Sequence, residues 1–144
     1  MSKTGIIAID VGGVLIEKKR QNGKDTNFDI DDIKWVPGAL NAVQTLCKKY
    51  DVYILSFCGK KTENETRQAL RKEVAKYIPE NKWLFTRERE HKIDKMKALN
   101  IDLLIDDTLE IIKWVQEAGM TGIHFRSPIF PGWDSVIDYL CKGS

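Results

Sequence analysis

Two kinds of segment alternate along this chain, as judged by the spacing of its apolar residues. Short continuous apolar runs predict strands that are buried on both faces, as in parallel sheets. Longer stretches repeat an apolar residue every three or four positions, which predicts helices with one buried face. Because strands alternate with helices, the connections must cross over, and we predict an α/β fold whose parallel sheet has helices on both faces. The expected strands span residues 5–10, 51–57, 82–86, 101–107 and 121–125.

Local signals place the ends of several elements. Thr62 starts a helix with the spacing of a capping box, and Gly119 ends a later helix at its C′ position. Asn22-Gly23 lies between two apolar stretches, which predicts a β-hairpin flap over about residues 15–30. The helix that ends at Gly119 is expected to bury Leu109, Ile112 and Val115.

Composition narrows the class of protein. A chain of 144 residues, 42% of them hydrophobic, can form its own core, and we expect one domain over residues 1–144. Three cysteines without CxxC spacing argue for reduced thiols, and against a disulfide framework or a zinc site. The first residues lack the pattern of a signal peptide, and no apolar run is long enough to cross a bilayer. We therefore predict a cytoplasmic protein without a membrane partner.

Polar side chains follow three of the apolar strands. Asp10 ends the first strand, Ser56 lies near the end of the second, and Asp106-Asp107 end the fourth. Parallel sheets bind ligands beyond the carboxyl ends of their strands, so these residues are expected to converge on one site. Gly12 and Gly13 let the backbone turn sharply after the first carboxylate.

Four motifs in a fixed order carry a resemblance to a known family. An apolar strand ends in DxGG at Asp10, a strand ends at Ser56, Lys92 opens a helix, and a strand ends in Asp106-Asp107. This order resembles the haloacid dehalogenase (HAD) superfamily, a large group dominated by Mg²⁺-dependent phosphatases. The resemblance covers nearly the whole chain. Each motif is weak alone, and the four together are specific.

The resemblance implies roles for the acidic residues. Asp10 corresponds to the nucleophile that forms an aspartyl-phosphate, a task that suits a carboxylate because it is ionised at neutral pH and gives a labile acyl-phosphate. Mg²⁺ would be held by Asp10, by the backbone carbonyl of Gly12 and by Asp106. Asp107 would support the metal through water or neighbouring groups. Hard oxygen ligands of this kind suit Mg²⁺.

The resemblance also implies how phosphate is bound. Ser56 corresponds to the residue that contacts a phosphate oxygen, helped by backbone amides of the turn around Cys58-Gly59. Lys92 corresponds to the lysine that neutralises the phosphate and the nucleophile, with Lys95, one turn later, as the competing choice. We read Cys58 itself as a bystander.

Two departures from the family pattern shape the functional prediction. Phosphatases of the family usually carry a second Asp two places after the nucleophile as general acid and base, and here that place is Gly12. General acid–base help is typically worth roughly 10²–10⁴-fold in rate, so aryl and acyl phosphates should react faster than alkyl phosphates. Glu17 is one substitute acid to consider. The second departure is that no extra domain fits between the motifs, which predicts a capless protein.

Three functions stay open at this point. The first choice is a Mg²⁺-dependent phosphohydrolase. The second is a catalytically weak HAD-like scaffold that binds phosphorylated ligands or a protein partner, which Gly12 favours. The third is a dehalogenase-type hydrolase, and the Asp106-Asp107 pair argues against it because it favours a metal.

Two structural expectations complete the prediction. If the strands that end at Asp10, Ser56 and Asp106 share a site, they must be neighbours, which predicts a Rossmann-like sheet with strand order 3-2-1-4-5. A capless site is open, so a large phosphorylated substrate can reach it. A net charge of +2 is too small to indicate nucleic acid by itself. The basic residues of the hairpin, which could steer an anionic polymer, are Lys18, Lys19, Arg20 and Lys24.

Overall fold

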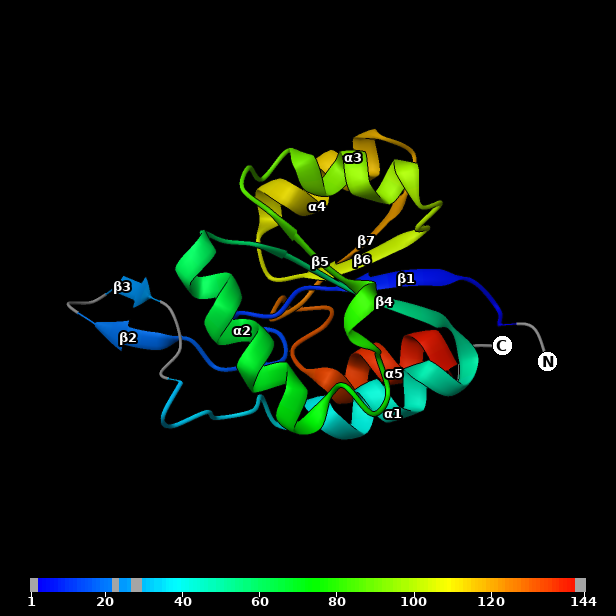
Figure 1. The fold of residues 1–144 in the computed structure, drawn as a ribbon. Coiled ribbons are helices and arrows are strands. Elements are labelled where there is room, and N and C mark those ends of the chain that lie inside the picture. Colours follow the sequence, from blue (N-terminus) through cyan, green and yellow to red (C-terminus); the bar gives the residue numbers. More distant parts are fainter. Residues whose placement is uncertain (1–2, 22–23, 27–29, 142–144) are drawn as a thin grey trace.

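A five-stranded parallel sheet is the centre of the computed structural model, which describes residues 3–21, 24–26 and 30–141 (Figure 1). Its strands lie in the order β5-β4-β1-β6-β7, which confirms the predicted order 3-2-1-4-5 with the Asp10 strand in the middle. All neighbouring strands pair in parallel. In chain order the strands are β1 (Ile6–Ile9), β4 (Asp51–Phe57), β5 (Trp83–Thr86), β6 (Leu103–Asp106) and β7 (Thr121–His124).

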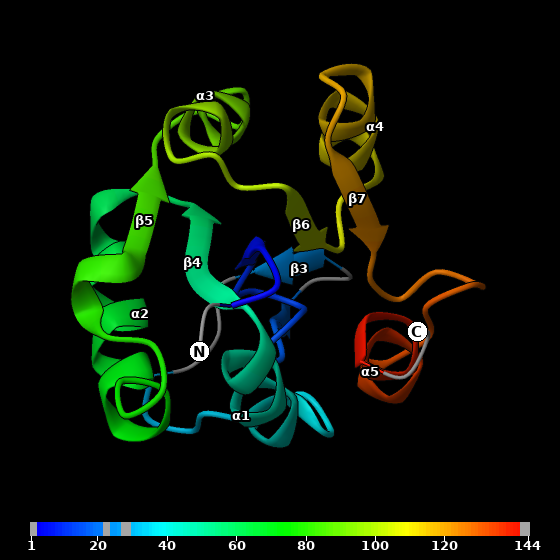
Figure 2. The ribbon, with the colours of Figure 1, turned by 90° about the vertical axis from the view of Figure 1, so that its right-hand side faces the viewer.

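Helices cover both faces of the sheet, as Figure 2 shows. One face carries α1, α2 and α5, and the other carries α3 and α4. The layers confirm the predicted α/β Rossmann-like fold. In the described part of the chain the α-helices are α1 (Ala39–Lys49), α2 (Lys60–Glu73), α3 (His91–Ala98), α4 (Leu109–Glu117) and α5 (Trp133–Cys141), and a 3₁₀ turn spans Glu80–Lys82.

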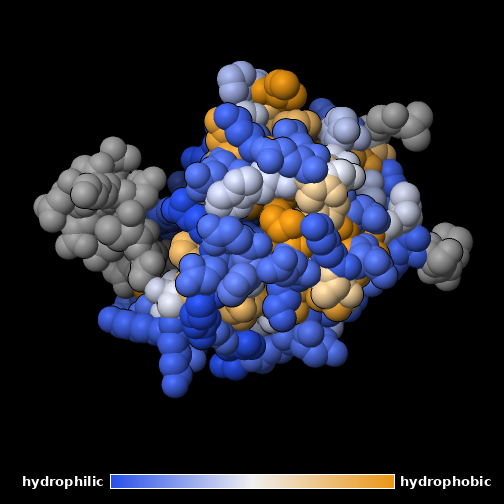
Figure 3. All heavy atoms as spheres, turned by 90° about the horizontal axis from the view of Figure 1, so that it is seen from above, coloured by the Kyte–Doolittle hydropathy of each residue, from blue (hydrophilic) through white to orange (hydrophobic). Residues whose placement is uncertain are grey.

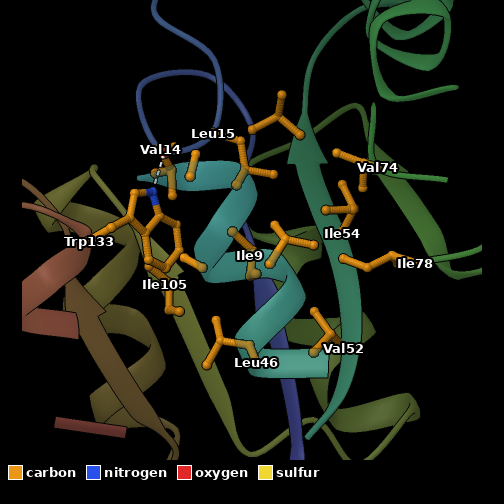
Figure 4. Packing of buried hydrophobic residues seen from close by; sticks show 14 of the residues in the cluster. Ile9, Val14, Leu15, Leu46, Val52, Ile54, Val74, Ile78, Ile105 and Trp133 are labelled. Carbon is orange, nitrogen blue, oxygen red and sulfur yellow. Dashed lines mark hydrogen bonds between the residues drawn. The ribbon is translucent and has the colours of Figure 1, made fainter. Parts of the chain in front are cut away.

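The central strand is buried on both sides because its side chains alternate between two hydrophobic cores. Ile7 and Ile9 lie in the larger core with α1, α2 and α5, and Ala8 lies in the smaller core with α3 and α4. Figure 4 shows the larger core, where side chains of β1 and β4 meet those of the covering helices. There the Trp133 Nε1 donates to the Val14 carbonyl at 2.8 Å, which links α5 to the loop after β1.

Two helix predictions are wrong in detail. Helix α2 begins at Lys60 with Gly59 at its N-cap, and its N-cap makes no side-chain capping bond in the described structure, so Thr62 lies in the first turn. The connection from β4 is short enough that the helix starts before the capping-box sequence. Leu109 is 49% exposed because it is the first residue of α4, at the edge of the sheet. The helix instead buries Ile111, Ile112 and Val115.

A separate two-stranded sheet follows β1. Strands β2 (Lys19–Gln21) and β3 (Lys24–Thr26) pair in an antiparallel way, and they project from the edge of the main sheet where its strands end (Figure 1). The predicted turn residues Asn22-Gly23, and the side chains of residues 19–29, lie outside what the structure describes. The stem of the hairpin is anchored because Ile16 forms β-bridges with Gly12 and Trp35.

The described helices are short or polar, and the surface over α3 and α4 is mostly hydrophilic. Within the described ranges, no helix combines the length and the apolar character needed to cross a bilayer. Viewed from above α3 and α4, hydrophilic side chains cover most of the surface, and hydrophobic ones show between them (Figure 3). The cytoplasmic location stays a prediction.

Candidate active site

The ends of the three central strands bring the predicted site residues together. Asp10 follows β1, Ser56 is the second-last residue of β4, and Asp106 ends β6. Strands β4 and β5 lie on one side of β1, and β6 and β7 lie on the other, so the strand order reverses at β1. Open parallel sheets bind ligands at such a switch point, beyond the carboxyl ends of the strands. A cavity of about 240 Å³ opens here. Its lining includes Asp10, Gly12, Lys18, Ser56, Phe57, Cys58, Thr62, Thr66, Arg89, Lys92 and Asp107.

Lys92 is the cation at the centre of the site. Its side chain is almost completely buried, and its Nζ lies 3.1 Å from Asp10 Oδ1 and 2.7 Å from Asp106 Oδ2. Burial by itself lowers the pKa of Lys92, but the charges of Asp10 and Asp106 outweigh burial and raise it. The competing residue, Lys95, is exposed one turn further along α3. The structure therefore brings Lys92, and not Lys95, to the carboxylates.

Three carboxylates gather around this lysine. Asp10, Asp106 and Asp107 each offer an oxygen, and these oxygens all lie within 4.8 Å of one another. Asp106 is fully buried, and its Oδ1 accepts a hydrogen bond from the Thr108 backbone at 2.9 Å. Burial, followed by the charge of Asp106, raises the pKa of Asp10 to about 7 despite Lys92. Burial also raises the pKa of Asp107. Crowded negative charge is thus the dominant electrostatic feature of the site.

The donor set fits a hard divalent cation. The buried Oδ1 of Asp107 has no hydrogen-bond partner among the described residues, which is costly unless a cation or water satisfies it. Among the side chains that the structure describes, three carboxylates also outnumber the two lysines that contact them, Lys92 and Lys18. Closely spaced carboxylate oxygens at a cavity are the ligands that Mg²⁺ takes in proteins.

The two glycines after Asp10 differ in what they require. Gly13 has a φ of +81°, and a Cβ at this position would lie 2.2 Å from Asp107 Oδ2. Gly12 has no such left-handed backbone, and its Cβ would meet only the flexible side chain of Lys18, at 3.1 Å from Cε. The absence of a side chain at Gly13 therefore lets the turn lie close to Asp107, whereas the backbone at Gly12 can accept a side chain.

We expect Gly13→Ala to be far more disruptive than Gly12→Ala. A left-handed backbone costs an L-residue roughly 1–2 kcal/mol, and the clash with Asp107 adds to it, so we expect a loss of about 2–4 kcal/mol of unfolding free energy. Gly12→Ala should lose less than about 1 kcal/mol because only a flexible side chain must move. Urea unfolding of both variants measures the difference. Equal losses would contradict the assigned backbone conformations.

The predicted phosphate cradle is partly wrong. Ser56 is buried and lines the cavity, as expected from its place at the end of β4. The Cys58 backbone amide, however, donates to the Thr86 carbonyl at 3.0 Å, so this amide is engaged between β4 and β5 rather than directed at a ligand. Burial raises the pKa of the Cys58 thiol, which keeps it protonated at neutral pH and fits its reading as a bystander.

Glu17, the substitute acid considered from the sequence, is engaged in an ion pair. Its carboxylate pairs with Arg126, whose Nε also donates to the Gly13 carbonyl at 2.9 Å. Glu17 is absent from the described lining of the cavity. This arrangement holds the turn after β1 against the segment after β7, so the glutamate serves the scaffold.

Several lining residues were not found by sequence reasoning. Arg89 lies over the ring of Phe57 at 5.6 Å and forms an ion pair with Glu110 at 3.3 Å. Lys18 reaches the cavity from the root of the hairpin, where its sequence context indicates only a basic surface. Their closeness in sequence to the motifs could have indicated these residues, because Phe57 directly follows Ser56 and Lys18 follows the glycine turn.

Comparison with known proteins supports the fold. No protein-family model matches the sequence, and no curated protein matches it. Among solved structures, a protein from Burkholderia xenovorans described as a haloacid dehalogenase-like hydrolase is 15% identical, with a TM-score of 0.61 over 90% of this chain and 85% of its own. A class C acid phosphatase from Bacillus anthracis is 18% identical, with a TM-score of 0.57 over all of this chain and 75% of its own. The same enzyme with tungstate bound gives a TM-score of 0.53. The chain therefore shares its fold with a haloacid dehalogenase-like hydrolase and with an acid phosphatase, in agreement with the fold predicted from its sequence.

Proposed function

We propose that this chain is a Mg²⁺-dependent phosphohydrolase that acts through an aspartyl-phosphate on Asp10. The observation that carries the proposal is the buried Lys92, whose ammonium lies 3.1 Å from Asp10 and 2.7 Å from Asp106 at the end of the central strands. A lysine between two carboxylates in a cavity can balance a phosphate that arrives beside them. The structural likeness to an acid phosphatase supports the same reaction class.

Each residue has a part in the proposed reaction. The Asp10 carboxylate attacks phosphorus, the ester P–O bond breaks, and the electron pair of that bond leaves with the alcohol oxygen. Lys92 holds Asp10 in place and offsets negative charge on the phosphoryl oxygens. Ser56 donates to a phosphoryl oxygen from the end of β4. Water then attacks the acyl-phosphate, which frees Asp10 and inorganic phosphate.

The metal site is proposed on the acidic cluster. Asp10, Asp106, Asp107 and the Gly12 carbonyl would hold Mg²⁺, with the orphaned Asp107 Oδ1 as the observation that supports a cation. When bound, Mg²⁺ offsets repulsion between the carboxylates and the phosphate. The direct test is a screen of phosphate esters with and without Mg²⁺. Turnover that needs Mg²⁺ supports the proposal, and no turnover of any ester rejects it.

A second candidate function is a scaffold that binds phosphorylated ligands without turning them over. Gly12 favours it, because the acid of the family pattern is missing there. Binding of inorganic phosphate with no hydrolysis in the screen would support this alternative. The partner, the size of the substrate and the steering role of the hairpin lysines stay predictions, because the side chains of residues 19–29 are not described.

We expect Mg²⁺ to stabilise the protein, and more strongly at pH 8 than at pH 6. The folded protein holds a proton on Asp10 up to pH about 7, whereas an unfolded Asp loses it near pH 4. In metal-free protein, stability should therefore fall as pH rises from about 4 to 7. Mg²⁺ competes with that proton, so its binding strengthens as the pH rises toward about 7 and levels off above that pH.

The expected size of the effect follows from mass action. Mg²⁺ at about 100 times its Kd adds about 2.7 kcal/mol, or roughly 10 °C in Tm for a chain of this size. Asp106→Asn should remove most of this shift, since one of three anionic ligands is lost. The matched control is Asp102→Asn. Asp102 is exposed and lies just before β6, at the end of the strand that is far from the site. A Tm that Mg²⁺ does not move, at either pH, would contradict the metal site.

A further inference from the structure

The space beside Gly12 is filled by Lys18. A Cβ built on Gly12 would lie 3.1 Å from Lys18 Cε, 3.7 Å from its Cγ and 4.0 Å from its Cδ. The lysine stem therefore occupies the place where a side chain at position 12 would begin. Both residues line the cavity beside Asp10. The acid that the family pattern expects at position 12 is absent, and a cationic side chain is in its place.

The backbone before Lys18 is fixed. The Glu17 amide donates to the Lys34 carbonyl at 2.8 Å, and the Gly13 amide donates to the Ile16 carbonyl at 2.8 Å. Arg126 links this backbone segment to the glycine turn, because it pairs with Glu17 and donates to the Gly13 carbonyl. Lys18 thus extends from an anchored segment, which makes its approach to Gly12 a feature of the fold.

Lys18 is the least tightly paired of the basic groups described in the cavity. Its side chain is 36% exposed, and its Nζ lies 3.6 Å from Asp107 Oδ2, longer than a hydrogen bond. Lys92 is buried between two carboxylates. Arg89 pairs with Glu110 and lies over Phe57. A positive charge beside the nucleophile, partly exposed and loosely paired, is suited to bind an oxygen that gains negative charge.

We infer that Lys18 binds the leaving oxygen of the substrate and stabilises the charge it acquires, which rests on the proposed function. As the P–O bond breaks, its electron pair stays on the alcohol oxygen, and an N–H of Lys18 donates a hydrogen bond to it. A water molecule supplies the proton that makes the free alcohol, and the hydroxide that remains is consumed when the acyl-phosphate is hydrolysed to inorganic phosphate. A cation in this place favours alkyl phosphates, because their leaving oxygens carry the most negative charge.

The test is a series of phosphate esters, from aryl to alkyl, with graded basicity of the leaving group. The variants are Lys18→Met, which removes the charge, and Lys18→Arg, which keeps it. Lys34→Met is the matched control, because Lys34 is 73% exposed and contacts only Asp32 among the ion pairs described. Tm values of all variants establish that they fold.

Loss of the charge should make the rate depend more steeply on the leaving group. For Lys18→Met we expect kcat/KM on alkyl phosphates to fall roughly 10²-fold, and on aryl phosphates with weakly basic leaving groups no more than about threefold. Lys18→Arg should stay within about tenfold of the native protein across the series. Gly12→Asp added to Lys18→Met should restore much of the alkyl rate, because the new carboxylic acid can protonate the leaving oxygen and the flexible side chain at position 18 can move to make room for it.

Three results would overturn the inference. Equal losses on aryl and alkyl esters would make Lys18 a general phosphate-binding or structural residue. A Lys18→Arg variant as slow as Lys18→Met on alkyl esters would exclude a role carried by positive charge. A native protein that hydrolyses no ester would reject the proposed function itself, and this inference with it. The first two results leave the phosphatase proposal standing.

Discussion

Asp10→Asn is expected to abolish phosphate-ester hydrolysis. An amide cannot form the acyl-phosphate, so turnover should fall by roughly 10⁴-fold or more, as when other enzymes lose their nucleophile. The change is nearly isosteric, and we expect the variant to fold with a similar Tm. Steady-state rates on the best ester of the screen, measured with Mg²⁺, give the result.

The control for this prediction is Asp102→Asn. Asp102 lies near the start of β6, at the opposite edge of the sheet, where its Oδ2 accepts from the Ile6 amide at 3.3 Å. This variant should keep the native rate. If Asp10→Asn retained most of a Mg²⁺-dependent activity, Asp10 would not be the nucleophile, and the attacking group would have to be sought among the other residues of the cavity.

Lys92→Met is expected to be the most destabilising change in the site. It leaves Asp10 and Asp106 buried side by side without their cation. Removal of one partner of a buried ion pair typically costs about 3–5 kcal/mol, which is a large share of the roughly 5–15 kcal/mol that keeps a domain folded. Urea unfolding in metal-free buffer measures the loss. Mg²⁺ should recover part of it, because a bound cation again balances the carboxylates.

Lys95→Met is the matched control on the same helix. Lys95 is exposed one turn away, and substitutions at such positions usually change stability by less than about 0.5 kcal/mol. A similar loss in both variants would mean that the lysines support α3 in some general way. A Lys92→Met variant as stable as the native protein would contradict the buried ion pair itself.

The sequence by itself determined the architecture of the sheet and the place of the acidic cluster. An apolar run such as Ile6–Ile9 can only be buried on both faces, which implies a parallel strand between two layers of helices. Once strands are parallel, their carboxyl ends share one edge. Asp10, Asp106 and Asp107 could therefore be assigned to one site, and their oxygens do lie within 4.8 Å of one another.

Only the tertiary structure decided which side chains beyond the strand ends reach that site. The choice between Lys92 and Lys95 depends on the rotation of α3, and Lys92 meets Asp10 across 82 positions of the chain. The same dependence on packing explains why Leu109 is exposed, since α4 begins beyond the carboxyl end of β6, where no other element covers this side chain fully. The period of the apolar residues predicts which of them share one face of a helix. Tertiary packing decides which residues on that face are buried.

Contacts between loops were equally invisible in the sequence. Engagement of the Cys58 amide by Thr86 follows from the pairing of β4 with β5, and the position of Lys18 over Gly12 follows from the bridges that anchor the hairpin stem. Gly12 and Gly13 are adjacent and identical in type, yet only Gly13 needs a left-handed backbone and the absence of a Cβ. The lack of room for a Cβ at Gly13 comes from Asp107, which reaches the turn from the loop after β6. Spacing along the chain fixes what a strand end carries, whereas a loop side chain is placed by the elements it packs against.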